Sequence, residues 1–259
     1  MLWIVGWMGL QQCWCQTGVV GLPGESAGGR QSSFLVMSSY PVSKTEGLGQ
    51  LMLQSERRYF SGLNRMMLAG SCKLGTQRIS AGMDQTGNGA MFRTHFWTAF
   101  GVSFSEKTMA GIRIGWQQQK ARGYGAQQGI SAGLGCAFQV SDQMEWRFQG
   151  DGLESFWQKG VTGSYRIRSM LYYECSSLLG LSGEVFLEEQ QTPVVSAGIH
   201  YAFAERCYAR AAMYSNLGTM SISAGFHWAG LQLEVTSVWH QLLSMSGSLG
   251  VGYRFTTKP

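Results

Sequence analysis

Charged and histidine residues recur at every second position in several segments of this 259-residue chain. Around Arg93 and His95, for example, the alternate positions hold Phe92 and Phe96. A period of two is that of a β-strand, whose successive side chains point to opposite faces. Because the polar positions mix both signs, they are suited to ion pairing on one shared face. The residues that we predict to line this polar face are Arg93, His95, Arg113, Arg147, Arg166, Glu174, Glu184, His200 and Glu234.

Hydrolysis by a serine and a histidine is an alternative chemistry. His240 lies close in sequence to Ser237, Ser244 and Ser246, and Glu234 shares the polar parity. Outer-membrane lipid hydrolases use Ser and His on a barrel wall. The sequence contains neither a Gly-x-Ser-x-Gly elbow nor a dinucleotide-binding glycine fingerprint before a helix. We therefore predict a protein that is not an enzyme, with no cofactor and no metal site.

The composition indicates which solvent surrounds the strands. Only 14% of the residues are charged, against roughly 25% in ordinary soluble domains, yet the mean hydropathy is −0.06 because Gly, Ser and Gln supply polarity. This balance is typical of strands with one face in lipid and the other in a polar lumen. The net charge is +5 and no dense Lys/Arg run occurs, so nucleic acid is not an expected partner.

Strand-length runs with short connections follow one another along most of the chain. They predict an all-β fold, a transmembrane up-and-down antiparallel β-barrel of about 14 strands, whose closure leaves no unpaired edge in hydrocarbon. A soluble β-sandwich or a lipocalin-like barrel is the alternative. The predicted strands are 63–73, 76–85, 91–105, 109–119, 127–140, 144–149, 157–167, 169–178, 181–188, 194–203, 207–214, 220–228, 231–239 and 245–255.

The N-terminal region is predicted to lie apart from the barrel. Residues 1–15 resemble an export signal with an apolar core and small residues at the cleavage site, although no Lys or Arg precedes that core, so a first buried strand or short helix is the alternative. Residues 16–60 form a segment that could enter the lumen, residues 61–255 form the barrel, and residues 256–259 form a tail.

The cysteines and the C-terminal sequence also fit a barrel that lies in a membrane. Cys72, Cys136, Cys175 and Cys207 fall at the apolar parity with no metal or disulfide spacing, which favours small hydrophobic side chains. The stretch "SLGVGYRF" carries the polar-x-Gly-x-x-aromatic-x-aromatic pattern that resembles the insertion signal of bacterial outer-membrane barrels. Its residues are Ser248, Gly250, Tyr253 and Phe255, and it predicts recognition by the barrel-assembly machinery.

Several longer stretches, "ERRYFSGLNRMMLAGSCKLG", "HFWTAFGVSFSEKTMAGIRIGWQQQKARGYG" and "VWHQLLSMSGSLGVGYRF" among them, resemble the PorV/PorQ-like outer-membrane proteins. These are relatives of the FadL long-chain fatty-acid transporters. The resemblance implies a barrel of about fourteen strands with an N-terminal segment inside, in a family that includes transporters of hydrophobic molecules and components of type IX secretion. The stretch "TEGLGQLMLQ" stands where relatives carry a plug motif, so no transport residue is carried over.

Three functional hypotheses follow from this sequence. The first is a bacterial outer-membrane barrel with a mostly filled, ion-paired lumen that acts in envelope structure or in PorV-like secretion, with secretion-system components as partners. The second is a FadL-like transporter or channel for small or hydrophobic solutes. The third is the barrel-wall lipid hydrolase. All three expect outer-membrane lipid around the barrel.

Overall fold

The computed structural model describes residues 49–58, 63–154, 164–189, 192–215, 219–240 and 244–255. The predicted export signal, most of the predicted lumen segment, the start of the strand predicted at 157–167 and the tail lie outside these residues. Among them, no helix is long and apolar enough to cross a membrane.

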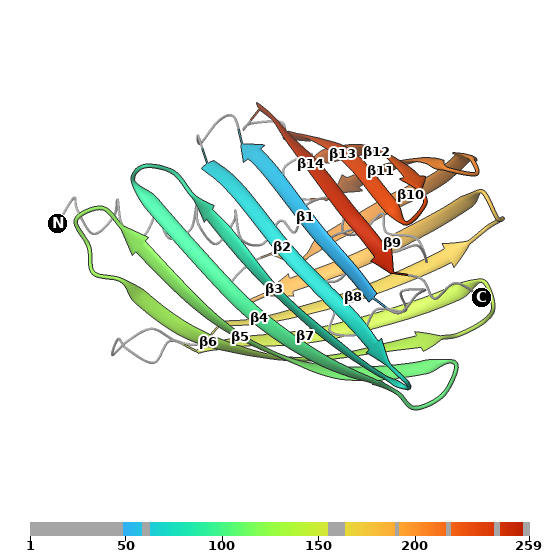
Figure 1. Ribbon diagram of the computed structural model, residues 1–259, viewed down its shortest axis with the longest axis horizontal. Coiled ribbons are helices and arrows are strands. Elements are labelled where there is room, and N and C mark those ends of the chain that lie inside the picture. Colours follow the sequence, from blue (N-terminus) through green and yellow to red (C-terminus); the bar gives the residue numbers. More distant parts are fainter. Residues whose placement is uncertain are drawn as a thin grey trace.

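Fourteen antiparallel strands form one closed barrel, in which each strand pairs with its neighbours in the sequence and the first pairs with the last (Figure 1). This confirms the predicted fold class. The strands are β1 (Gly49–Arg58), β2 (Leu63–Leu74), β3 (Gln77–Gly87), β4 (Met91–Ser103), β5 (Thr108–Ala121), β6 (Gln127–Gln139), β7 (Met144–Glu154), β8 (Ser164–Glu174), β9 (Leu179–Glu188), β10 (Val194–Ala204), β11 (Cys207–Tyr214), β12 (Met220–Trp228), β13 (Leu231–His240) and β14 (Ser244–Phe255).

The two ends of the barrel differ in the length of their connections. At the end where Gly49 pairs with Phe255, the connections contain two to four residues, whereas at the other end they contain three to nine. The β12–β13 hairpin is closed by Ala229 and Gly230, whose φ angles are 47° and 87°. Positive φ at both central positions is the type I′ geometry that matches the twist of paired strands. Bacterial outer-membrane barrels show the same asymmetry, with short periplasmic turns and longer external loops.

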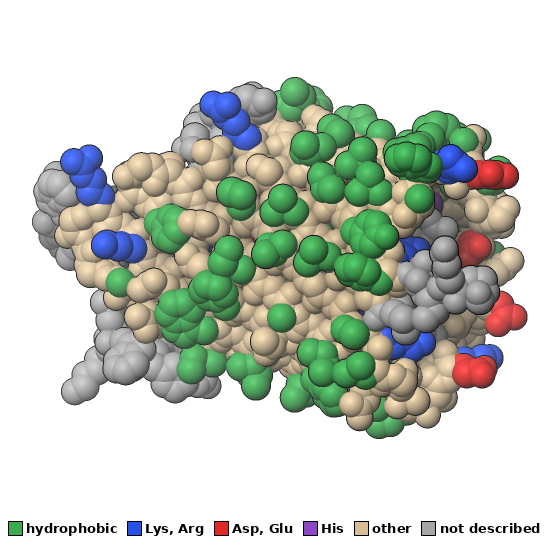
Figure 2. Space-filling model, viewed as in Figure 1, with side chains coloured by type: hydrophobic (Ala, Val, Ile, Leu, Met, Phe, Trp, Pro, Cys, Tyr) green, Lys and Arg blue, Asp and Glu red, His purple; other side chains and the backbone are tan. Residues whose placement is uncertain are grey.

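Apolar side chains cover the outside of the wall. On β4, Phe96 and Phe100 are 44% and 38% exposed, whereas the intervening Trp97 is 3% exposed. Figure 2 shows hydrophobic side chains over the visible face, with charged ones gathered towards the two ends. A soluble protein would turn these rows inward, so the surface is that of a protein surrounded by hydrocarbon.

Polar groups on the outer face are few and some of them are paired. The indole Nε1 of Trp146 donates a hydrogen bond to the Ser169 hydroxyl, 2.9 Å away. The thiols of Cys72, Cys136 and Cys207 are free, and they lie at the outward, apolar parity that the sequence predicted. The remaining predicted thiol, Cys175, lies in the β8–β9 turn.

The predicted strand count was right through two compensating errors. The barrel begins at Gly49 and not near residue 61, because β1 occupies the end of the stretch assigned to the N-terminal segment. The strands predicted at 157–167 and 169–178 are, within the described residues, the single strand β8. Arg166 and Arg168 lie on the same face of this strand, at the inward parity, and the strand continues through both. In β1, the inward Met52 obscured the alternation.

The outward apolar rows generate a stability prediction. Ile114, near the middle of β5 and 57% exposed, should tolerate arginine poorly, because the Ile114→Arg variant would hold a charge in the hydrocarbon midplane. The expected loss of unfolding free energy is about 2–4 kcal/mol, measured by urea titration in lipid vesicles. Phe104→Arg, in the β4–β5 turn, is the matched control and should cost about 0–1 kcal/mol. Equal costs at both positions would contradict a lipid-facing β5.

Candidate functional site: the polar inner face

All nine residues predicted to line the polar face lie on strands at inward parity. Arg93 and His95 are on β4, Arg113 on β5, Arg147 on β7, Arg166 and Glu174 on β8, Glu184 on β9, His200 on β10 and Glu234 on β13. The ion pairs recorded for five of the nine join them to residues outside that set. The sequence alternation also predicts four of these five partners at the polar parity, namely Glu145, Arg168, Glu188 and Arg210, and Asp151 is the one that it missed.

One arc of the wall, from β5 to β9, carries successive ion pairs. Arg166 Nε lies 2.9 Å from Glu188 Oε1, and the two residues are directly opposite in the β8–β9 register. Arg168 Nε lies 3.0 Å from Glu184 Oε1 on the same two strands, in a diagonal pair, since Arg168 itself stands opposite Phe186. These pairs are partly buried, so each loses hydration that its partner must replace.

The pair between Arg113 and Asp151 joins two strands that are not neighbours. Arg113 on β5 and Asp151 on β7 both stand opposite Gly133 of β6, and their Nη2 and Oδ2 atoms are 2.9 Å apart. A Cβ at Gly133 would overlap the Asp151 carboxylate. The glycine thus leaves the space through which the two side chains meet across an intervening strand.

A second arc of charge lies on β1 to β5. Arg65 donates from Nε to Asp84 Oδ2 at 2.6 Å, and its Nη1 is 4.0 Å from Glu56 Oε2. On the next strands, Arg93 donates from Nη2 to the side-chain oxygen of Gln117 at 3.2 Å. Charge-assisted hydrogen bonds of this kind fix side chains on a wall that has few other constraints.

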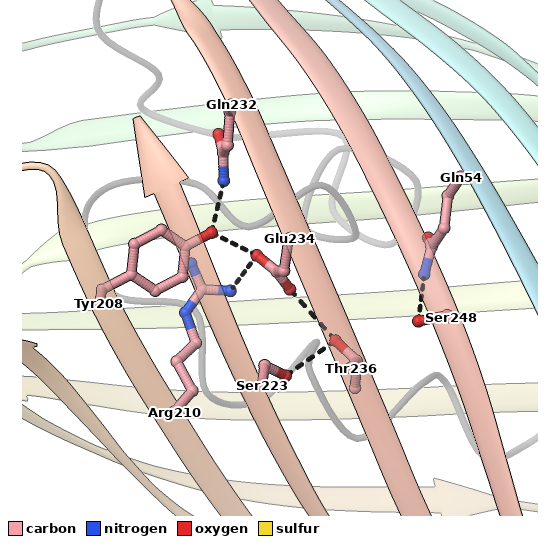
Figure 3. A network of polar contacts seen from close by, with 8 residues as sticks. All are labelled: Gln54, Tyr208, Arg210, Ser223, Gln232, Glu234, Thr236 and Ser248. Carbon is pink, nitrogen blue, oxygen red and sulfur yellow. Dashed lines mark hydrogen bonds and ion pairs between the residues drawn. The ribbon is translucent and has the colours of Figure 1, made fainter. Parts of the chain in front are cut away.

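The most deeply buried network lies on β11 to β13 (Figure 3). The Tyr208 hydroxyl donates to Glu234 Oε2 at 2.5 Å and accepts from Gln232 Nε2 at 2.8 Å. Arg210 Nη1 lies 3.1 Å from the same carboxylate oxygen, with side-chain exposures of 1% for Arg210 and 4% for Glu234. On the other side, Thr236 contacts both Glu234 and Ser223.

This network has the same arrangement as Arg113, Gly133 and Asp151, in which two side chains meet over a glycine of the strand between them; we call this arrangement a glycine bridge. Tyr208 on β11 and Glu234 on β13 both stand opposite Gly225 of β12, where a Cβ would overlap the tyrosine ring. The rings of His200 and His227 flank Tyr208, with centroids 5.6 Å and 5.0 Å away. Within the described part of the chain, no group of His, Cys, Asp and Glu could hold a metal ion.

The structure describes the side chains of three residues of the predicted hydrolase set, Glu234, Ser237 and Ser246. The carboxylate of Glu234 is engaged by Tyr208 and Arg210, and Ser237 lies at outward parity on the same strand. The side chain of His240 lies outside the described residues. The described side chains of this region form the Arg210–Glu234 ion pair and its hydrogen bonds.

The seam between the first and last strands holds the predicted insertion signal. Gln54 on β1 donates to the Ser248 hydroxyl on β14 at 3.4 Å. Gly250 also points inward, whereas Tyr253 and Phe255 point outward with their rings edge-to-face at 5.0 Å. The insertion role itself stays a prediction.

An apolar patch on the inner face escaped the sequence analysis. Met52, Met67, Ala69, Trp97 and Ala99 of β1, β2 and β4 form a buried cluster at the inward parity. The Trp97 ring lies over Gly82 of the neighbouring strand, where a Cβ would overlap it. The sequence offered one signal for this patch, because Trp97 lies two residues after His95 and therefore on the same face of the strand.

The comparisons with known proteins concern the fold. No protein-family model matches the sequence, and no curated protein matches it. Among solved structures, the Pseudomonas putida toluene transporter TodX has a TM-score of 0.60 at 7% identity, covering 88% of this chain and 93% of that one. A TodX deltaS2S3 mutant, a monoaromatic hydrocarbon channel, reaches 0.64 at 9% identity, covering 89% and 98%. The CymD monoaromatic hydrocarbon channel reaches 0.60 at 10% identity, covering 83% and 90%. The chain therefore shares the barrel fold of these membrane channels.

The glycine bridge at Gly133 generates a second prediction. In Gly133→Ala, the added methyl group should push the Asp151 carboxylate away from Arg113 and cost about 1–3 kcal/mol of unfolding free energy, as overpacking does. The measurement is urea unfolding of the folded barrel in detergent. Gly183→Ala is the matched control, because a Cβ there meets nothing within 4 Å, and it should leave stability unchanged. A neutral Gly133→Ala variant would contradict the bridge.

The Arg210–Glu234 pair generates a third. Glu234→Ala should cost about 3–5 kcal/mol, because it leaves the Arg210 guanidinium buried without its carboxylate. The double variant Arg210→Met, Glu234→Leu should lose much less, because neither charge remains. The single variants Arg210→Met and Glu234→Leu are measured with them by the same unfolding titration, and a double variant whose cost is strictly the sum of these two would show that the residues do not act as a pair.

Proposed function

We propose that this protein is a bacterial outer-membrane barrel that passes small, mainly hydrophobic solutes, as its FadL-like resemblance suggests. The observation that carries the proposal is a closed fourteen-stranded barrel, apolar outside, whose inner face combines charged networks with an apolar Met–Trp patch. Barrels larger than about eight strands have more interior than their wall side chains fill. The fold neighbours TodX and CymD support the proposal, since their names describe a toluene transporter and a hydrocarbon channel.

The inner apolar patch supports a solute with an apolar body. Met52 and Met67 are unbranched thioethers that adapt to irregular partners, and Trp97 offers an aromatic face. These side chains are at most 3% exposed, so a solute with an apolar body would meet the margin of the patch and not its centre. The polar arcs beside the patch would keep water in contact with the same space.

The orientation follows from the connections. The short-turn end, which also carries the start of β1 and the end of β14, would face the periplasm, and the longer connections would face outward. The C-terminal pattern of β14 would be read there by the barrel-assembly machinery. Outer-membrane lipid is the remaining partner of the outer face.

The secretion hypothesis receives less support than transport. The fold neighbours described above are channels and transporters.

Uptake by intact cells tests the proposal. Gram-negative cells that express the protein should take up radiolabelled toluene, at concentrations below saturation, several-fold faster than cells with an empty vector. Met67→Ala should lower this uptake about fivefold, the equivalent of about 1 kcal/mol, because the buried Met67 side chain supports the apolar patch. Met213→Ala, the same change on the outer face where the side chain is 66% exposed, is the matched control and should have no effect. Equal uptake with and without the protein would contradict transport.

A further inference from the structure

Basic residues at the outward parity of the strands are confined to one end of one sector of the barrel. Arg57 on β1 and Lys120 on β5 lie next to the longer connections, and Arg122 follows in the β5–β6 turn. All three residues are exposed. By contrast, no outward residue of strands β8 to β14 is a Lys or an Arg. We call Arg57, Lys120 and Arg122 the basic rim.

The strand register joins Arg57 to Lys120 through one outward residue on each strand between them. The row is Arg57, Asn64, Gly87, Phe92 and Lys120. Neighbouring strands lie about 4.8 Å apart, so the row is about 19 Å long. The backbone N–H of Arg122 donates to the Ala90 carbonyl of the β3–β4 connection. This hydrogen bond holds the β5–β6 turn beside the row.

No carboxylate shares the outer wall of β1 to β6 with the basic rim. These strands contain two carboxylates, Glu56 and Asp84, and both lie on the inner face beside Arg65. The connections at the same end, 59–62, 88–90 and 122–126, contain neither Asp nor Glu. Figure 2 shows Lys and Arg side chains without acidic ones at the left end of the visible face, whereas the right end carries both signs. Lys120 and Arg122 therefore direct a positive field towards the surrounding lipid.

The outward residues change in kind from the rim towards the membrane midplane. Two residues further along each strand, about 6.8 Å away, most side chains carry an amide or a hydroxyl group. This row is Ser55, Met66, Gln85, Thr94, Gln118 and Gln128. The next row is apolar and consists of Leu53, Leu68, Met83, Phe96, Trp116 and Ile130. The Phe96 and Trp116 rings stack with their centroids 5.8 Å apart, as in the aromatic girdle at a hydrocarbon boundary.

The order of these three rows fits one class of membrane lipid. In a phosphorylated glycolipid, acyl chains are followed by sugar hydroxyls, which amide side chains can hydrogen-bond, and by phosphates, which Lys and Arg bind through charge-assisted hydrogen bonds. A glycerophospholipid has its phosphate directly next to its acyl chains and offers no sugar to the amide row. The rim is also about 19 Å long, which suits a headgroup with more than one phosphate.

We infer that the basic rim binds a phosphorylated glycolipid of the outer leaflet against the outer wall of β1 to β6. The inference rests on the proposed function for the outer-membrane location and for the orientation in which the longer connections face outward. It does not require transport, because the glycolipid lies on the outer face of the wall and a transported solute lies on the inner face.

Competition between two lipids tests the inference. The full chain in detergent is mixed with equal amounts of bis-phosphorylated lipid A and of the same lipid A without its phosphates, and native mass spectrometry measures the ratio of the two bound lipids. The phosphorylated lipid should be favoured about twentyfold or more. A Lys or Arg near an anionic lipid contributes about 1 kcal/mol, which is about fivefold. The double variant Lys120→Gln, Arg122→Gln should therefore lower the preference about tenfold or more.

The matched control makes the same two changes at the other end of the barrel. Lys107 and Arg206 are exposed residues of the β4–β5 and β10–β11 turns. The double variant Lys107→Gln, Arg206→Gln loses the same charge and should leave the lipid preference unchanged. Heat-dependent migration on a denaturing gel shows that each variant is folded before its lipids are compared.

Each outcome decides the inference. Equal binding of the two forms of lipid A, binding of neither, or an equal loss of preference in the two double variants would overturn it. Binding of dioleoyl phosphatidylglycerol as tight as that of lipid A, at the same phosphate concentration, would also overturn it, because any anionic lipid would then suffice. If toluene uptake is absent while the preference is present, the transport proposal fails and the glycolipid site stands. If uptake is present without the preference, the reverse holds.

Discussion

The structure depends on the hydrogen bonds of its backbone. In hydrocarbon an unpaired N–H or C=O group costs several kcal/mol, so a sheet can cross a bilayer only if it has no edge. The fourteen strands meet this condition because β1 pairs with β14 over ten residue pairs. Once the sheet closes, each strand has one face in lipid and one in the enclosed space, and the alternation of the whole sequence follows from that division.

Closure also determines the chemistry of the interior. Long side chains on the concave side of a curved wall converge. Where two partners meet across an intervening strand, that strand has a glycine, Gly133 in one case and Gly225 in the other. The same device serves an ion pair, Arg113 with Asp151, and a hydrogen bond from Tyr208 to Glu234. Glycine is thus a structural requirement of this inner face, in addition to easing the coiling of the strands.

Alternation along single strands was enough to predict the fold, because the period of two is a local property. It was not enough to predict the partners. Asp151 was missed because the outward Gly150 and Gly152 on either side of it resemble a turn, so β7 was ended too early. Tyr208 was missed because its role depends on Gly225 and Glu234, which lie on other strands. The contact between Trp97 and Met67 was missed because they lie on different strands, and the alternation along one strand does not show which apolar residues of the inner face lie together.

The seam between the first and last strands has a consequence for how the chain folds. Gln54 and Ser248, which meet across it, are 194 residues apart in the sequence, whereas the other thirteen strand pairings join neighbours in the chain. A contact between residues so far apart forms only after the chain has lost the entropy of closing a long loop, and the stabilising contacts form afterwards. The pairing of β1 with β14 is therefore the strand pairing with the largest entropy cost, and a barrel that lost it would keep thirteen local pairings and gain two free edges.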